Sequence, residues 1–221
     1  MSPPIWSTVE GVENRLLKFL KSFHHQEKIM CRNNEMKEAF MLISLIQKRR
    51  SIRKFQKKQV ETEKIDTLIE AALRSPSSIG RNPWEFIFVT EQTLLEKLSR
   101  AKPHGSAFLK NAPLGIVVCA DPDTSDVWIE DSSIAAIFLH LAAESIGLAS
   151  CWIQMRERMH DQTKTAQDYV SQTLDIPSRL KVECIIAVGY PDEKKPPHKK
   201  EELQYDKVYL DMYGKSYGIT P

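Results

Sequence analysis

The sequence predicts an α+β protein in which helices outnumber strands. Three short runs, residues 84–89, 114–120 and 182–190, are rich in apolar, β-branched and aromatic residues, as strands are. Longer stretches between them repeat apolar residues at helical spacing, and no regular strand–helix alternation links the runs. The phosphate-loop patterns G-x-G-x-x-G and G-x-x-x-x-G-K-[ST] are also missing from the sequence. These observations favour α+β over a doubly wound sheet.

Composition limits the classes of function. The chain has 221 residues, enough for one large domain or two small ones, and 42% hydrophobic with 27% charged residues fits a globular protein. A net charge of +2 is small for a nucleic-acid-binding domain. No apolar run reaches the roughly 18 residues of a membrane span, and the N-terminus has no apolar signal core.

Cysteine and histidine spacing predicts neither disulfides nor a metal site. The four cysteines are far apart and form no C-x-x-C pair, and the histidines show no H-E-x-x-H spacing. Reduced core thiols in a cytoplasmic protein are the expectation.

Residues 1–35 differ from the rest and are interpreted as an N-terminal extension. An amphipathic helix is expected from about Thr8 to Phe23, followed by a polar linker. Met36 would itself serve as a natural start. The extension is therefore either an additional helix or translated upstream sequence.

The elements of the first half follow from local patterns. A helix from about Lys37 to Lys48 presents a wide apolar surface, and a second helix, 62–74, has Thr62 as its expected N-cap. A loop rich in Pro, Ser, Gly and Asn then leads into the strand 84–89. The next helical pattern covers residues 90–101.

In the second half, the run 114–120 is almost wholly apolar, so we expect a central strand buried on both faces. Asp131 or Ser132 is the expected cap of a buried helix that ends near Ile146. Residues 149–154 are a short strand or loop, 164–174 a helix, and 182–190 a third buried strand. The tail after residue 200 has few apolar residues and is expected to pack against another subunit.

The basic stretch that follows the helix at Lys48 allows three interpretations. Arg49, Arg50, Ser51 and Arg53 could bind a phosphate, because guanidinium groups match phosphate oxygens two at a time. Lys and Arg also favour the negative end of a helix dipole, so a solvated helix end is the simpler explanation of this stretch taken alone. Seven of the eleven residues from Lys48 to Lys58 are basic, which would also suit nucleic acid.

Four separated motifs together resemble the nitroreductase family of FMN-dependent oxidoreductases. They are RRSIRKF at 49–55, SPSSIGRNPWEFIFV at 75–89, DSSIAAIFLHLAAESIGLASCWI at 131–153 and VECIIAVGYPDEKK at 182–195. The resemblance covers residues 36–209 in the family's order and leaves 210–221 as a C-terminal tail. It implies a central mixed β-sheet flanked by helices, here with an extra N-terminal helix.

The resemblance also implies roles for residues of the first two motifs. Arg49, Ser51 and Arg53 match the family's binders of the FMN phosphate and ribityl chain, with Arg50 adjacent. Residues of the second motif match a loop against the flavin of the partner subunit: Pro76, Ser77, Ser78, Gly80 and Asn82. Gly80 stands where many members have Asn and has no side chain for that contact. Asn82 stands where they have Gln and can still offer an amide to the flavin ring edge.

Later positions are expected to face the flavin ring and to close on its phosphate. Trp152, Ile153, Gln154 and Met155 match a segment whose backbone faces the ring, with an N–H from Gln154 or Met155 near N5. Lys199 and Lys200 match a late basic position near the phosphate, although a solvated charge run explains them almost as well. No side chain is expected to titrate during catalysis.

Two functions of different classes follow. The first is an FMN-dependent oxidoreductase, a homodimer that uses NADH or NADPH in a ping-pong mechanism to reduce nitroaromatic, quinone or related electron-poor acceptors. The alternative is a binding module for nucleic acid or an anionic surface through the basic run 48–58. The small net charge and the apolar core favour the enzyme.

Overall fold

The computed structural model describes residues 41–216, and the chain divides into two units, residues 1–46 and 47–221. A helix covers residues 41–48 and so ends at Lys48, as the sequence predicts. The expected N-terminal extension, residues 1–35 with its extra helix, lies outside the described residues. In the described part of the chain, no helix combines the length and the apolar character needed to cross a membrane.

The second unit is built on a four-stranded sheet with the order β1-β2-β4-β3. The strands are β1 (Trp84–Val89), β2 (Leu114–Ala120), β3 (Ala149–Gln154) and β4 (Lys181–Gly189). All three neighbouring pairs are antiparallel. We expected a mixed sheet; within residues 41–216, parallel pairing is confined to an isolated bridge between Ser51 and Ser150.

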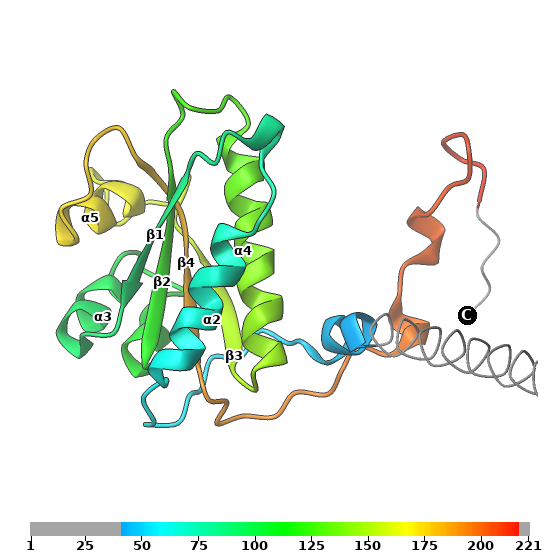
Figure 1. Ribbon diagram of the computed structural model, residues 1–221, viewed down its shortest axis with the longest axis horizontal. Helices are drawn as coiled ribbons and strands as arrows, with labels where there is room; N and C mark the ends of the chain where they lie inside the picture. Colours follow the sequence, from blue (N-terminus) through cyan, green and yellow to red (C-terminus); the bar gives the residue numbers. More distant parts are fainter. Residues whose placement is uncertain (1–40, 217–221) are drawn as a thin grey trace, which may run out of the picture. The chain divides into compact units, whose positions relative to one another are not determined.

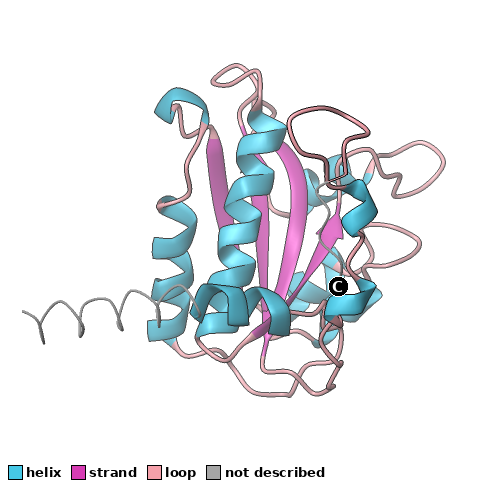
Figure 2. Ribbon diagram, turned by 90° about the vertical axis from the view of Figure 1, so that its right-hand side faces the viewer, coloured by secondary structure: helices cyan, strands magenta, loops and turns pink. Residues whose placement is uncertain are grey.

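Helices cover both faces of the sheet (Figure 1). The helices α2 (Thr62–Leu73) and α4 (Trp128–Ser145) lie on one face, and α3 (Gln92–Leu98) and α5 (Ala166–Thr173) lie on the other. Figure 2 shows two long helices running in front of the strands. This arrangement confirms the α+β class, with helices gathered on the faces of an antiparallel sheet.

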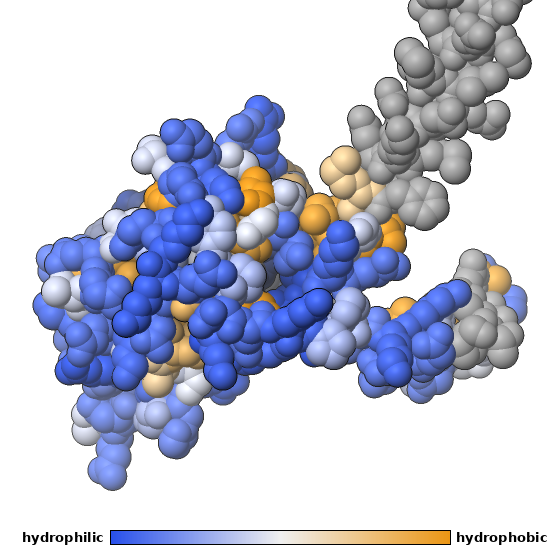
Figure 3. All heavy atoms as spheres, turned by 90° about the horizontal axis from the view of Figure 1, so that it is seen from below, coloured by the Kyte–Doolittle hydropathy of each residue, from blue (hydrophilic) through white to orange (hydrophobic). Residues whose placement is uncertain are grey.

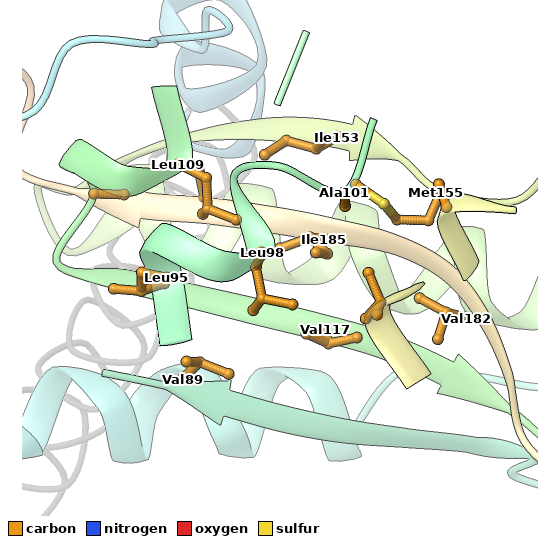
Figure 4. Packing of buried hydrophobic residues seen from close by; sticks show 14 of the residues in the cluster. Val89, Leu95, Leu98, Ala101, Leu109, Val117, Ile153, Met155, Val182 and Ile185 are labelled. Atoms are coloured by element: carbon orange, nitrogen blue, oxygen red, sulfur yellow. The ribbon is translucent and has the colours of Figure 1, made fainter. Parts of the chain in front are cut away.

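The core consists of two layers that the sheet separates. On the side of α3 and α5, one cluster joins residues such as Leu95, Leu98, Val117 and Ile185 (Figure 4). A second cluster packs α2 and α4 against the opposite face. Every residue of β2 is buried, which explains why its sequence is an unbroken apolar run.

One helix begins earlier than its sequence suggests. The helix α4 starts at Trp128 with Val127 as its N-cap residue, whereas Asp131 or Ser132 was the expected cap. Asp131 is instead buried, and its carboxylate accepts the Ser78 N–H at 2.8 Å and the Ser125 hydroxyl at 2.9 Å. The carboxylate therefore joins the helix to the loop before β1 rather than capping the helix.

Candidate functional site

The basic cluster of residues 49–53 lies along the free edge of the sheet. Within residues 41–216, β3 is an edge strand, because β4 is its only neighbour in the strand order. Ser51 forms the parallel bridge with Ser150, and the Ile52 N–H donates to the Ser150 carbonyl oxygen at 3.2 Å. This pairing sets the arginines of the cluster beside the first half of β3.

The segment after β4 adds a cation and a carboxylate to this cluster. The Lys195 ammonium donates to the Ser51 carbonyl oxygen at 2.6 Å, and the Arg50 guanidinium donates to a backbone carbonyl of the same segment. Glu193 accepts the Arg53 N–H at 2.6 Å, and this bond lowers the pKa of Glu193. Sequence reasoning missed both new members. The signal was present, since Lys195 ends one of the four motifs.

A buried histidine lies behind Arg49. His140 of α4 is 6% exposed, and its Nδ1 is 2.6 Å from the Ser150 hydroxyl oxygen. Burial, helped by the charge of Arg49, lowers the pKa of His140 to about 4. The imidazole is therefore neutral at pH 7. It serves as a hydrogen-bond partner that holds Ser150, the residue with which the basic cluster pairs.

The hydrogen bonds of β3 decide which of its N–H groups face outward. Successive residues of an antiparallel strand point their backbone groups alternately toward the partner strand and away from it. The Met155 N–H donates to the Glu183 carbonyl oxygen of β4 at 3.1 Å, whereas the Ser150 carbonyl oxygen bonds outward. Trp152 and Gln154 lie two and four residues after Ser150, so their backbone groups also point away from β4. Of the two expected donors, Met155 therefore uses its N–H in a hydrogen bond to β4, whereas the Gln154 N–H points to the free edge.

The side chains at this end of β3 support its backbone. Trp152 donates its indole N–H to the Gln154 amide oxygen at 2.9 Å. Ile153 is 1% exposed, and its side chain lies in the cluster of Figure 4. Its backbone groups face β4 by the same alternation. Ile153 was expected at the cofactor, but within one chain it is a core residue that fixes the positions of its two neighbours.

The loop of residues 75–83 is held by its own hydrogen bonds. Ser77 and Asn82 bond to each other, because the Ser77 hydroxyl donates to the Asn82 side-chain oxygen and accepts the Asn82 N–H, at 2.7 and 2.9 Å. Ser78 is fixed by Asp131. The amide nitrogen of the Asn82 side chain has no partner among residues 41–216, so it can donate to a ligand. Gly80 has a φ of +73°, a conformation that favours glycine, so a side chain there would be strained.

One chain does not bring all of the expected residues together. Trp84 follows the loop and pairs with Ala120, while Gln154 pairs with Cys184, so loop and strand end lie at the same end of the sheet. They lie on opposite edges, however, which three strand spacings of about 4.8 Å keep roughly 14 Å apart. Pro76 and the rest of the loop are therefore separate from the free edge of their own β3.

The two expected late lysines also lie apart from the cluster. Lys199 and Lys200 are exposed at the start of a 3₁₀ turn, Lys200–Glu202. Within the described residues, neither side chain forms a hydrogen bond or ion pair with the arginines. Lys195 is the basic residue of this segment that reaches them.

The basic run 48–58 divides at Arg53. Before it, the arginines lie at β3; after it, lysines such as Lys57 lie on a groove of about 680 Å³. Lys58 already has partners within the chain, because its ammonium nitrogen lies 3.0 Å from a Glu61 carboxylate oxygen and 3.8 Å from the centre of the Tyr190 ring. The run is therefore not one open basic surface, which weakens the nucleic-acid interpretation.

Comparison with known proteins identifies the family. The model of the nitroreductase family matches residues 46–102 and 99–190, which is more than half of the chain. The chain belongs to the nitroreductase family. The predicted membership and fold class are both confirmed, and none of these similarities supports the alternative of a nucleic-acid or anionic-surface binding module.

Individual nitroreductase-family proteins match over most of their length. A structure described as an FMN-dependent nitroreductase from Clostridium difficile R20291 is 48% identical, with a TM-score of 0.76, and covers 77% of this chain and 99% of its own. A protein of Methanothermobacter thermautotrophicus, provisionally named an NADH dehydrogenase/NAD(P)H nitroreductase, is 33% identical over 78% of this chain and 87% of its own. An iodotyrosine deiodinase of Thermotoga neapolitana is 26% identical over 74% of this chain and 95% of its own.

Proposed function

We propose that this nitroreductase-family protein is an FMN-dependent oxidoreductase that uses NADH or NADPH to reduce nitroaromatic, quinone or related electron-poor acceptors. The observation that carries the proposal is the free edge of β3. A basic cluster lies at one end of it, and the outward N–H of Gln154 lies at the other. Ser150, with which the cluster pairs, and Gln154 are four residues apart, or about 13 Å along the strand.

The donors at this edge fit FMN. Arg49, Ser51, Arg53 and Lys195 offer guanidinium, hydroxyl and ammonium groups, which are the groups that bind phosphate oxygens well. Arg50 is adjacent but uses its guanidinium on a backbone carbonyl. A ribityl phosphate would therefore lie against the first half of β3. The similarity to the FMN-dependent nitroreductase from Clostridium difficile R20291 supports this assignment.

The chain would position the reacting groups. Bound FMN would supply the redox chemistry, taking a hydride from NADH or NADPH and passing electrons to the acceptor in a ping-pong sequence. The Gln154 N–H would donate to N5 from a strand that other contacts already hold. A donor fixed in this way stabilises charge without reorganising. His140, which holds Ser150 beside the basic cluster, does not need to titrate, since it is already neutral at pH 7.

We also propose a homodimer in which a second copy brings its 75–83 loop to the free edge of β3. The separation of loop and edge within one chain supports this arrangement, as does exposed apolar surface. Ile134, Ile137 and Phe138 form a stripe on α4 and are at least 37% exposed. Figure 3 shows apolar residues interrupting an otherwise hydrophilic surface. In the tail, several large apolar residues are exposed as well: Leu203, Val208, Leu210, Met212 and Tyr213.

We expect sedimentation velocity to show one species of two chains, because stable dimers of this kind bury on the order of 2,000 Å² or more. Phe138→Asp should shift the protein toward monomer and weaken FMN binding, since it places a charge in the apolar stripe. Lys97→Asp, which changes an exposed residue of α3 on the other layer, is the control. An FMN-loaded monomer in the unaltered protein would refute the dimer.

The function is tested first by the flavin itself. The purified protein should show a flavin absorption spectrum, or acquire one with added FMN, and the spectrum should bleach anaerobically with NADH or NADPH. Comparing both donors and then a panel of acceptors defines the substrates. A protein that cannot be loaded with FMN, yet retards DNA in a salt-dependent manner, would favour the binding module instead.

A cytoplasmic location is part of the proposal. Three cysteines, Cys119, Cys151 and Cys184, are buried and unpaired. Burial raises the pKa of Cys119 to about 12, so this thiol is protonated and unreactive at neutral pH. Buried reduced thiols are the usual state in a reducing compartment, which supports this location.

A further inference from the structure

A buried glutamate interrupts the apolar strand β4. Glu183 is 3% exposed in a strand whose other residues are almost all buried and apolar. The register with β2 shifts here, because Cys119 pairs with Val182 while Val118 pairs with Cys184. Glu183 is thus the extra residue of a β-bulge. Bulges of this kind redirect a side chain and often occur next to active sites.

The Glu183 backbone binds the end of β3. Its carbonyl oxygen accepts two N–H groups, that of Met155 at 3.1 Å and that of Arg156 at 3.0 Å. The chain leaves the sheet directly after these two hydrogen bonds. The bulge therefore defines where β3 ends, which is at Gln154.

The Glu183 side chain binds the same segment. One carboxylate oxygen accepts the Gln154 side-chain amide at 3.3 Å, and the other lies 3.1 Å from the Arg156 Nε. The second contact is an ion pair without hydrogen-bond alignment, and both atoms are otherwise unsatisfied. Burial raises the pKa of Glu183, while Gln154 and Arg156 act in the opposite direction.

Burying these charged groups costs desolvation free energy, so the ion pair is better explained by a positioning role than by a gain in stability. A buried ion pair contributes little net stability, because desolvation offsets its attraction. Replacing Glu183 by alanine would remove the acceptor of the Gln154 side chain and one of the two carboxylates beside Arg156, whose other partner is Glu157, so the segment 154–156 would lose its side-chain attachment to β4. The position of that segment therefore depends on the Glu183 carboxylate.

We propose that Glu183 is a positioning residue that holds the Gln154 N–H in place at the free edge of β3, acting through Arg156 and the Gln154 side chain. The role in turnover rests on the proposed function. The anchoring itself does not, because every contact involved lies within the flavin-free chain. Nothing in the residue's own sequence neighbourhood indicates this role; it follows from the bulge.

The test compares Glu183→Ala with Glu183→Gln and with Val182→Ala, a neighbouring β4 residue that is equally buried but does not touch Gln154. Amide hydrogen exchange of peptides covering residues 150–158 is measured first, in flavin-free protein. The visible spectrum of added FMN and anaerobic bleaching by the preferred nicotinamide cofactor are measured second. Glu183→Asp, which keeps the charge but withdraws it by one methylene, replaces the alanine variant if that variant does not fold.

We expect Glu183→Ala to speed exchange at 150–158, to shift the flavin bands and to slow bleaching roughly tenfold, because a small misplacement of a fixed group has large effects on rate. Glu183→Gln keeps the acceptor for the Gln154 side chain but removes the charge that faces Arg156, so its effects should lie between those of the unaltered protein and those of Glu183→Ala. Equal effects of Glu183→Ala and Val182→Ala, or effects of Glu183→Gln as large as those of Glu183→Ala, would overturn the proposal. If the unaltered protein neither binds FMN nor bleaches, the proposed function fails, and the exchange data still decide the anchoring.

Discussion

Gln154→Pro is expected to slow reduction of the bound flavin by NADH or NADPH roughly 10²–10³-fold, the usual loss when one fixed donor is removed from a reacting centre. Proline has no N–H, and the Gln154 N–H faces away from β4. The substitution therefore removes the proposed donor without breaking a bond of the β3–β4 ladder. Stopped-flow bleaching under anaerobic conditions measures the effect.

The matched variant is Gln154→Ala, which keeps the N–H and should retain most of the rate. Both variants must still bind FMN and remain dimeric for the comparison to hold. Met155→Pro is a poor substitute, since the Met155 N–H donates to Glu183 and its loss would disturb the bulge. A Gln154→Ala protein that no longer bleaches, beside a normal Gln154→Pro protein, would assign the role to the side chain.

Arg49→Ala or Arg53→Ala should weaken FMN binding about tenfold to a hundredfold each and leave the fold intact. Charge-assisted hydrogen bonds to phosphate contribute roughly 1.5–3 kcal/mol, and neither arginine belongs to the apolar core. Fluorescence titration of the apoprotein with FMN gives the affinities. Lys57→Ala is the control, because it removes a charge from the same run away from β3.

Arg49→Ala has a second expected result that does not depend on flavin. The charge of Arg49 helps to lower the pKa of His140, so its removal should raise that pKa. Histidine NMR titration measures the change, and burial alone should still hold the pKa below the ordinary value. Unaltered FMN affinity in both arginine variants would return the cluster to its simpler interpretation as a solvated helix end.

Local sequence patterns predicted the elements best where burial left no alternative. Residues 114–120 form a strand at the predicted bounds, because an unbroken apolar run must be covered on both faces. The start of α4 was predicted less well. Asp131 is a good capping residue, but the structure uses its carboxylate to hold Ser78, and the helix begins at Trp128 without a side-chain cap. A tertiary contact outweighed the local signal.

The candidate site was predicted by residue type and completed by tertiary contacts. Guanidinium groups at 49–53 indicate phosphate binding in any fold, so the cluster could be found from the sequence. Lys195 reaches Ser51 from 144 positions away, and Glu183 holds Gln154 across 29. Contacts of this kind depend on which strands are neighbours, and local patterns do not contain that information.

The sequence by itself determined the family, the α+β class and the basic cluster, because these depend on the order and type of residues. Only the tertiary structure decided that Gln154 rather than Met155 offers its N–H at the free edge of β3. The physical reason is the pairing of β3 with β4. Every second N–H of β3 donates to its antiparallel neighbour, and the register fixes which ones. A shift of one residue would exchange the two roles without changing a single amino acid.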